Sequence, residues 1–94
     1  MKLEVSEDAA KWFASEMHLK PGDFVRFVVK LYGGIPTAHP SYYLGISLGR
    51  DRDIDVKDEV GGITFYFTHE DSWFLGEYDL KVEEKNGEVD YIFQ

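Results

Sequence analysis

Cysteine is absent from all 94 residues of the chain. This absence excludes disulfides, thiolate metal sites, iron–sulfur ligation by the chain's own cysteines and cysteine nucleophiles, and it fits a reducing compartment. Long apolar runs are also missing, and the opening stretch Met1–Val5 does not resemble a signal peptide. We therefore expect a cytoplasmic protein that has no membrane partner.

Basic residues are few: 10 Lys and Arg stand against 18 Asp and Glu, which gives a formal net charge of −8. Nucleic-acid binding needs a clustered basic surface, but the two arginines of the Arg50–Asp53 segment alternate with aspartates. We expect no nucleic-acid partner, and we attribute the acidity to solubility. The length predicts one domain, residues 1–94, with enough aromatic residues to form a core.

Two predicted strands and the loop between them lie at the centre of the chain. Phe24–Tyr32 is rich in β-branched and aromatic residues, and Tyr42–Leu48 alternates with a period of two. The connection Gly33–Ser41 has nine residues, including two glycines and two prolines, whereas a simple reversal needs about two to five. We interpret it as a binding loop, and a relic loop is the alternative. The candidate binding residues are Gly33, Gly34, Ile35, His39, Tyr42 and Tyr43.

The remaining pattern predicts a β-rich α+β fold. Ser6 and the acidic residues after it predict an N-cap and a helix over about Ser6–Met17, packed on a mostly antiparallel sheet. Thr68–Asp71 has the form of a capping box that opens a short late helix with Ser72–Leu75 as its packed side. Further strands are expected near residues 3–5, 54–60, 63–67, 78–82 and 89–93. The residues expected to be largely buried are Phe13, Phe27, Val29, Leu44, Ile46, Phe65 and Leu80.

No catalytic constellation can be identified. Gly45–Gly49 matches G-x-S-x-G, but a nucleophile elbow needs a strand-to-helix turn, and Ser47 lies within a strand pattern. Asp51–Asp55 resembles the start of a calcium loop, but Val56 and Gly62 occupy the positions of the turn glycine and the closing glutamate, so we interpret it as a solvated acidic turn. The three histidines lack metal-ligand spacing. We therefore predict a non-enzyme with no catalytic residues, no metal site and no cofactor.

The order of several short motifs resembles the HesB-like, A-type iron–sulfur carrier family. These motifs are a Ser-led helix with Ala9-Ala10, a Pro21-Gly22 turn, an Arg-Phe-x-Val strand ending in Tyr32-Gly33-Gly34, a hairpin pair and a late acidic segment. The resemblance covers nearly the whole chain and is greatest to the short subgroup of the family. It implies a distorted two-sheet β-sandwich with an N-terminal helix and a short late helix, and a relation to iron–sulfur cluster assembly.

The family's cysteines have no counterparts in this chain. Ile35 stands where the family's first cysteine follows Gly-Gly, and the C-terminal Cys-x-Cys is replaced by the ending Asp90–Gln94. The resemblance therefore implies a divergent HesB-like protein that cannot ligate a cluster and acts as a non-catalytic module binding a protein partner of the iron–sulfur assembly machinery. The alternative is a small-molecule or metal-binding protein that uses His39 and carboxylates. The oligomeric state is not predicted.

Overall fold

Two β-sheets face each other in the computed structural model of the chain, which describes residues 2–38, 41–76 and 78–94. The larger sheet has the strand order β3-β4-β2-β6-β5. Its strands are β2 (Phe24–Lys30), β3 (Ile35–Pro36), β4 (Tyr43–Leu48), β5 (Val56–Val60) and β6 (Ile63–Phe67). The smaller sheet has the order β1-β7-β8. Its strands are β1 (Leu3–Val5), β7 (Leu80–Lys85) and β8 (Glu88–Phe93).

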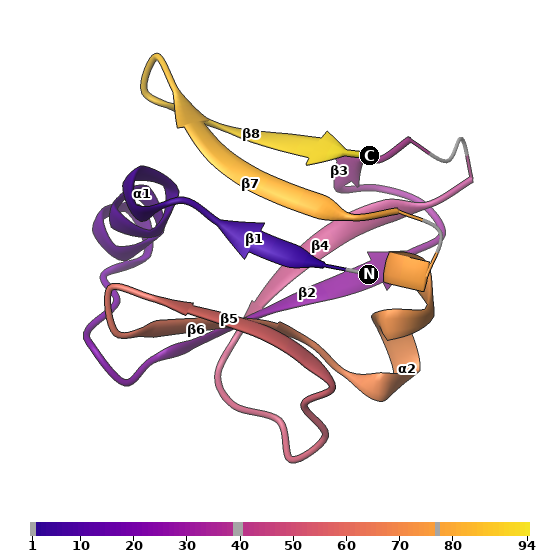
Figure 1. Cartoon of the computed structure of the whole chain (residues 1–94), viewed down its shortest axis with the longest axis horizontal. Coiled ribbons are helices and arrows are strands. Elements are labelled where there is room, and N and C mark those ends of the chain that lie inside the picture. Colours follow the sequence, from indigo (N-terminus) through magenta and orange to yellow (C-terminus); the bar gives the residue numbers. More distant parts are fainter. Residues whose placement is uncertain (1, 39–40, 77) are drawn as a thin grey trace.

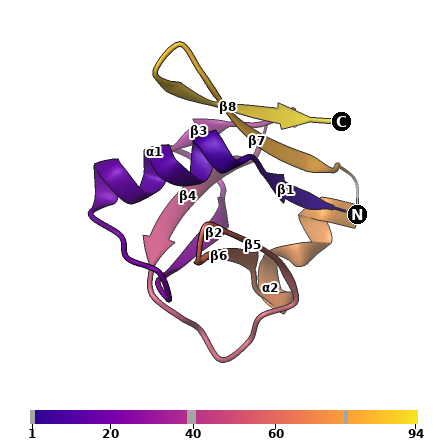
Figure 2. The same cartoon turned by 60° about the vertical axis from the view of Figure 1, so that its left-hand side comes forward.

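Helices close the two ends of this arrangement. Helix α1 (Glu7–Met17) lies at one end, and α2 (His69–Ser72), which continues as the 3₁₀ helix η1 (Trp73–Gly76), lies at the other (Figure 1). Figure 2 shows that α1 runs between the level of the smaller sheet and that of the β5–β6 hairpin. The prediction of a β-rich α+β fold with one early helix and one short late helix is confirmed. None of the helices in the described ranges is long and apolar enough to cross a membrane.

The start of α1 follows the sequence prediction closely. The Ser6 hydroxyl oxygen accepts a hydrogen bond of 3.0 Å from the Ala9 N–H, as an N-cap should. The helix ends because His18 adopts the left-handed conformation, with φ +54°. Ala9, Ala10 and Phe13 form the buried face of the helix. The helix therefore covers the core at one end of the two sheets.

The strand pairing within the described residues is mixed. Four pairs are antiparallel, as expected for most of the sheet. Two pairs are parallel: β1 with β7, and β2 with β6. The first parallel pair carries the N-terminal strand into the smaller sheet next to a strand near the C-terminus. This crossover makes the fold depend on contacts between distant parts of the chain.

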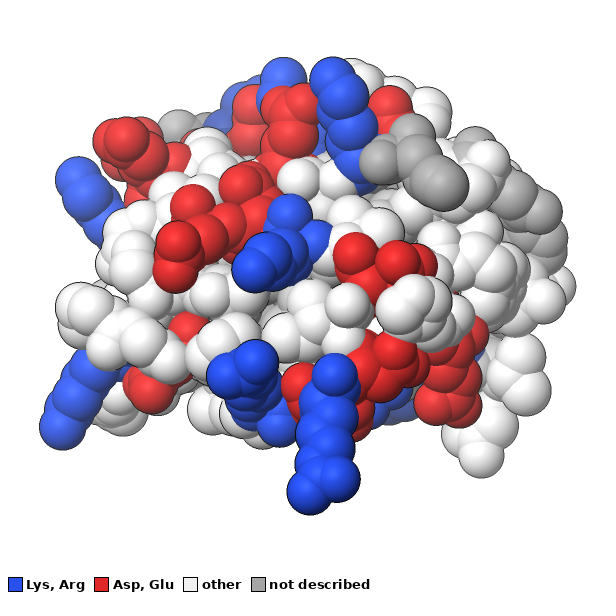
Figure 3. Space-filling model, turned by 60° about the horizontal axis from the view of Figure 1, so that its bottom comes forward, with Lys and Arg blue, Asp and Glu red and all other residues white. Residues whose placement is uncertain are grey.

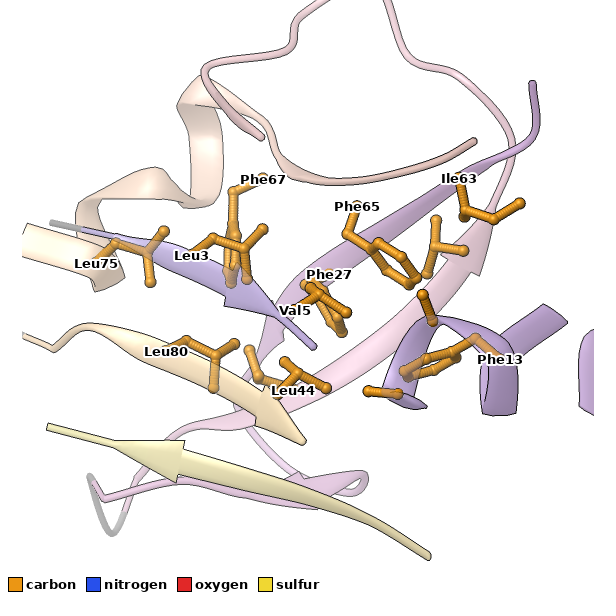
Figure 4. Packing of buried hydrophobic residues seen from close by; sticks show 14 residues of the cluster. Leu3, Val5, Phe13, Phe27, Leu44, Ile63, Phe65, Phe67, Leu75 and Leu80 are labelled. Atoms are coloured by element: carbon orange, nitrogen blue, oxygen red, sulfur yellow. The ribbon is translucent and has the colours of Figure 1, made fainter. Parts of the chain in front are cut away.

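The core lies between the sheets and is dominated by aromatic rings. Figure 4 shows side chains from α1, β2 and β6 meeting those from β1 and β7. Phe13, Phe27 and Phe65 form the centre, with the rings of Phe13 and Phe65 5.3 Å apart. Five of the seven predicted core residues are buried: Phe13, Phe27, Leu44, Phe65 and Leu80. Val29 and Ile46 are only half-buried, although both pack against the core cluster, because the covering layer does not extend fully over them.

The predicted capping box does not form, although the helix that it was expected to open is present. Thr68 is the N-cap of α2, but its side chain makes no capping hydrogen bond. Its hydroxyl oxygen instead accepts a hydrogen bond of 3.2 Å from the Arg26 guanidinium. A charged donor offers Thr68 a stronger partner than a backbone amide does, so the side chain serves the contact between α2 and β2.

Candidate interaction surface

Exposed apolar side chains project from the end of β2. The strand ends at Lys30, two residues earlier than predicted, and the next two residues, Leu31 and Tyr32, are 70% and 82% exposed. Gly33 and Gly34 then turn the chain with φ of +74° and +109°. A Cβ atom on Gly34 would lie 2.4 Å from the carbonyl oxygen of Leu44, so only glycine fits there without rearrangement.

The predicted nine-residue loop is partly a strand. After the glycines the chain pairs with β4 as β3, with Ile35 opposite Leu44 and Pro36 opposite Tyr43. Ile35 is half-buried and packs against the core, and its part in a binding surface stays a prediction. Burial of an apolar side chain against the core lowers the free energy of the folded protein, because apolar surface is removed from water. His39 lies outside the described residues, and its role stays a prediction.

The side chains of Tyr42 and Tyr43, which follow the loop, point to opposite faces of the larger sheet. The ring of Tyr42 packs edge-on against Trp73, with centroids 5.2 Å apart, and it also lies 6.5 Å from the ring of Phe74. Tyr43, the next residue, pairs with Lys30 and points to the opposite face of the larger sheet. The two side chains thus lie on different faces of the sheet, and the role of each in binding stays a prediction.

Trp73 is the residue that the sequence interpretation missed. We expected Ser72–Leu75 to form a packed side, but Trp73 is 45% exposed while Phe74 and Leu75 are buried. Consecutive residues of a 3₁₀ helix point in different directions, so three large apolar residues in a row cannot all face the core. Such a run directly after a four-residue helix is the signal that could have indicated an exposed aromatic side chain.

Several exposed apolar or aromatic residues lie near the end of β2 that pairs with the start of β4. Leu31 and Tyr32 follow Lys30, whose partner Tyr43 follows Tyr42, and the ring of Tyr42 contacts Trp73. We define Leu31, Tyr32, Tyr42 and Trp73 as the apolar rim. In Figure 3, apart from the atoms in grey, few acidic or basic side chains lie at the right-hand end, whereas both kinds are interspersed over the rest of the visible face.

A network of ionic contacts holds α2 against β2 beside the apolar rim. The half-buried guanidinium of Arg26 lies 3.4 Å from Asp71, 3.7 Å from Asp51 and 3.9 Å from Glu70. Asp71 is only 7% exposed, and its burial raises the pKa of its carboxyl, while the positive charge of Arg26 works against that rise. Arg26 therefore fixes the position of the segment that carries Trp73.

His69 ties the acidic turn to the same helix. Its Nδ1 contacts the carboxylate of Asp53, its Nε2 lies 3.2 Å from Asp55, and its backbone N–H donates to Asp53 at 3.1 Å. The hydrogen bond to Asp53 raises the pKa of the imidazole, and the charges of Asp53 and Asp55 add to the rise. The turn is exposed to solvent, as predicted, and contacts with His69 also hold it against α2. We define His69, Asp53 and Asp55 as the His69 clamp.

The polar groups of this region are paired with one another rather than arranged for catalysis. The Ser72 hydroxyl donates to Asp55, and both ring nitrogens of His69 face carboxylates, so neither nitrogen is available to receive a proton from Ser72. Within the described ranges no three His, Asp or Glu side chains are grouped to hold a metal ion. The region is suited to presenting a fixed surface.

Comparison with known proteins supplies a full-length relative. The chain is 32% identical over 94 residues to the Bacillus subtilis (strain 168) protein named pyruvate dehydrogenase inhibitor, and the match covers 100% of this chain and 98% of the relative. It is 24% identical over 95 residues to an uncharacterised protein of Staphylococcus saprophyticus, with 97% of each chain covered. No family model and no solved structure matches the chain.

This match corrects the functional hypothesis drawn from the sequence. The HesB-like resemblance implied a relation to iron–sulfur cluster assembly and a partner in that machinery, whereas the full-length curated relative carries the name of an inhibitor of pyruvate dehydrogenase. The hypothesis was wrong because short motifs shared with a family describe the backbone, and the residues that would carry the family's chemistry are absent. The chain belongs to the family of the Bacillus subtilis pyruvate dehydrogenase inhibitor.

Proposed function

We propose that this chain is a non-catalytic regulator that binds and inhibits a pyruvate dehydrogenase. The observation that carries the proposal is the 32% identity to the Bacillus subtilis protein, which extends over the whole of this chain and 98% of the relative. The two sequences therefore align along nearly their whole compared length rather than over one shared segment. The named action of the relative is thus the best guide to the action of this chain.

The apolar rim is the surface that we propose for contact with the enzyme. Leu31 and Tyr32 are the most exposed of the chain's large apolar side chains among the described residues, and Trp73 lies beside Tyr42. Clustered exposed apolar side chains are typical of protein-binding surfaces, and aromatic rings supply contact area at a low cost in side-chain entropy. The paired glycines, Arg26 and the His69 clamp hold the segments that carry this rim, which reduces the entropy lost on binding.

The pairing of the polar groups supports a binding role over a catalytic one. A catalytic acid or base needs a proton-transferring atom that can reach the substrate. In the His69 clamp both ring nitrogens face carboxylates, and the Ser72 hydroxyl is engaged by Asp55. A protein that inhibits through contact needs no such atom.

Sedimentation velocity tests the proposal directly. The purified chain carries a fluorescent label and is mixed with pyruvate dehydrogenase purified from the organism that encodes it. The sedimentation of the labelled chain is then followed by its fluorescence. We expect a fraction of the label to sediment with the enzyme, and this fraction should saturate as more chain is added. A label that sediments only at the rate of the isolated chain, with an enzyme that retains full activity, would contradict the proposal.

We also propose that the backbone is HesB-like, independently of function. The order of one early helix, a strand that leads into Tyr32-Gly33-Gly34, a hairpin and a short late helix supports this, as does the arrangement of two sheets. Superposition of an experimentally determined structure of this chain on HesB-like structures tests the proposal. A different strand order in the two sheets would contradict it, and the proposed inhibition would not be affected.

A further inference from the structure

Strand β8 is the outer strand of the smaller sheet. Within the described residues it pairs only with β7, and it lies at the top of the molecule in both Figure 1 and Figure 2. Asp79 and Gln94 exchange two backbone hydrogen bonds of 3.0 Å, which marks their pair as a hydrogen-bonded one. Hydrogen-bonded and non-hydrogen-bonded pairs alternate along an antiparallel ladder. The backbone N–H and C=O groups of Val89 and Tyr91 therefore point away from β7, along the outer edge.

The other sheet edges in the described part of the chain are shorter or covered. Strand β3 has only two residues. Strands β1 and β5 lie side by side, and the Asp58 carboxylate accepts a hydrogen bond of 2.8 Å from the Val5 N–H. A side-chain carboxylate placed on an edge amide blocks the addition of a strand there. The half of β8 next to the Asn86-Gly87 turn pairs with no further strand among the described residues, and at that turn the Trp12 indole N–H donates to the Gly87 carbonyl at 3.0 Å.

The side chains along this edge carry excess negative charge. Glu88 and Asp90 are exposed and lie on the outer face of the smaller sheet, where Glu88 stands opposite Lys85. Asp90 stands opposite Glu83, which already has Lys81 as its ionic partner at 3.6 Å. Like charges on directly opposed residues repel. Asp90 therefore favours a cation supplied by a neighbouring strand.

We infer that β8 accepts an extended basic segment of a partner protein as an added strand, with Lys or Arg at alternate positions facing Glu88 and Asp90. Backbone hydrogen bonds to Val89 and Tyr91 would supply affinity, and the charges would supply selectivity. A second copy of this chain is a poor occupant, because β8 paired with itself would bring the acidic residues of two chains with net charge −8 together. In identifying the partner as the inhibited dehydrogenase, the inference rests on the proposed function.

The edge of β8 leads toward the apolar rim. Phe93, the last residue of β8, lies 5.9 Å from the ring of Phe74, and Phe74 lies beside Tyr42 and Trp73. A segment seated along β8 would therefore approach the rim at the C-terminal end of the strand. One partner could occupy both surfaces, with its basic strand on β8 and an apolar part on the rim.

A synthetic peptide of about six residues alternating lysine and valine tests the edge directly, because that length matches a typical strand. The amide resonances of the chain are followed by NMR while the peptide is added. We expect the largest shifts at Val89 and Tyr91, and no comparable shifts with a peptide alternating glutamate and valine. Shifts centred on another surface would overturn the inference.

Two substitutions separate backbone pairing from general attraction to an acidic protein. Val89→Pro removes an outward N–H without removing a hydrogen bond to β7, and we expect it to weaken peptide binding about fivefold, as the loss of one hydrogen bond does. Asp90→Lys should weaken binding further than Glu16→Lys, an equal change of charge on an exposed residue of α1. Equal affinity of Asp90→Lys and Glu16→Lys would overturn the inference even if the proline variant fails to fold.

The outcomes also separate this inference from the proposed function. If the chain inhibits the dehydrogenase but does not bind the peptide at β8, the added strand is wrong and the proposed function stands. If the chain binds the peptide at β8 but does not affect the dehydrogenase, strand addition is supported and the proposed partner is wrong.

Discussion

The indole ring of Trp73 packs edge-on against the phenol ring of Tyr42, with centroids 5.2 Å apart and ring planes at 71°. This contact joins η1 to the chain that enters β4. Trp73 also lies 5.9 Å from the buried ring of Phe74, which anchors it to the core. The exposed part of the indole is therefore held in one orientation, as a contact residue of a binding surface should be.

Substitution of Trp73 by alanine should impair inhibition far more than stability. The lost ring contacts are expected to lower the free energy of unfolding by about 1 kcal/mol, the value of an aromatic pair. Loss of a central aromatic contact should weaken inhibition by more than about tenfold. Chemical denaturation measures the change in stability, and an activity titration measures the change in inhibition. Trp73→Phe keeps an aromatic ring, so its inhibition should be weaker than that of the wild type and stronger than that of Trp73→Ala. A large loss of stability with unchanged inhibition would contradict this assignment.

Leu31 and Leu48 provide a matched pair at opposite ends of the larger sheet. Both are exposed, at 70% and 54%, so either change to alanine should alter the free energy of unfolding by less than about 0.5 kcal/mol. Only Leu31 belongs to the apolar rim. We therefore expect Leu31→Ala to raise the concentration of chain needed for half-inhibition, and Leu48→Ala to leave it unchanged. Equal effects of the two substitutions would show that the rim is not the contact surface.

Gly33 and Gly34 differ in what surrounds them, although both have positive φ. A side chain on Gly33 would meet open space, whereas one on Gly34 would collide with the Leu44 carbonyl. Gly33→Ala should cost about 1 kcal/mol for the left-handed conformation alone. Gly34→Ala should cost more, about 2–3 kcal/mol, because the backbone must also move. Urea denaturation gives both values, and equal costs would mean that the turn does not approach β4 as described.

The His69 clamp should make stability depend on pH in a defined direction. The pKa of His69 is raised above 6.5 in the folded protein, first by its hydrogen bond to Asp53. Its contribution is thus fully present below about pH 6.5 and is lost as the pH rises through the raised pKa. The difference in Tm between the wild type and His69→Gln should shrink as the pH rises from about 6 to about 9. A difference that grows over that range would contradict the clamp.

Local chemistry made several features predictable from the sequence. The β-branched and aromatic residues of Phe24–Tyr32 indicated a strand, and Ser6 identified the start of the first helix. The two tight turns, Gly61-Gly62 and Asn86-Gly87, have positive φ at both positions, as hairpin turns of these residues favour. Each of these signals lies within a few residues, so no knowledge of distant contacts was needed.

The features that the sequence did not reveal depend on long-range placement. Strand β3 has two residues and therefore no readable period, and it forms only because β4 offers an edge. The contact of His69 with Asp53 requires α2 to lie beside the acidic turn, and the exposure of Trp73 requires Phe74 to take the inward position. The enzyme named by the relative leaves no signature in any motif of this chain, because a contact surface has no fixed residue spacing.

We propose that the folded chain inhibits a pyruvate dehydrogenase through direct contact. The most direct test is a titration of the purified enzyme with the purified wild-type chain, in which pyruvate-dependent activity is measured at each concentration. The account predicts that activity falls in proportion to the chain added until the binding sites are filled, and that chain unfolded beforehand has no effect. Full activity at saturating concentrations of the folded chain would contradict it.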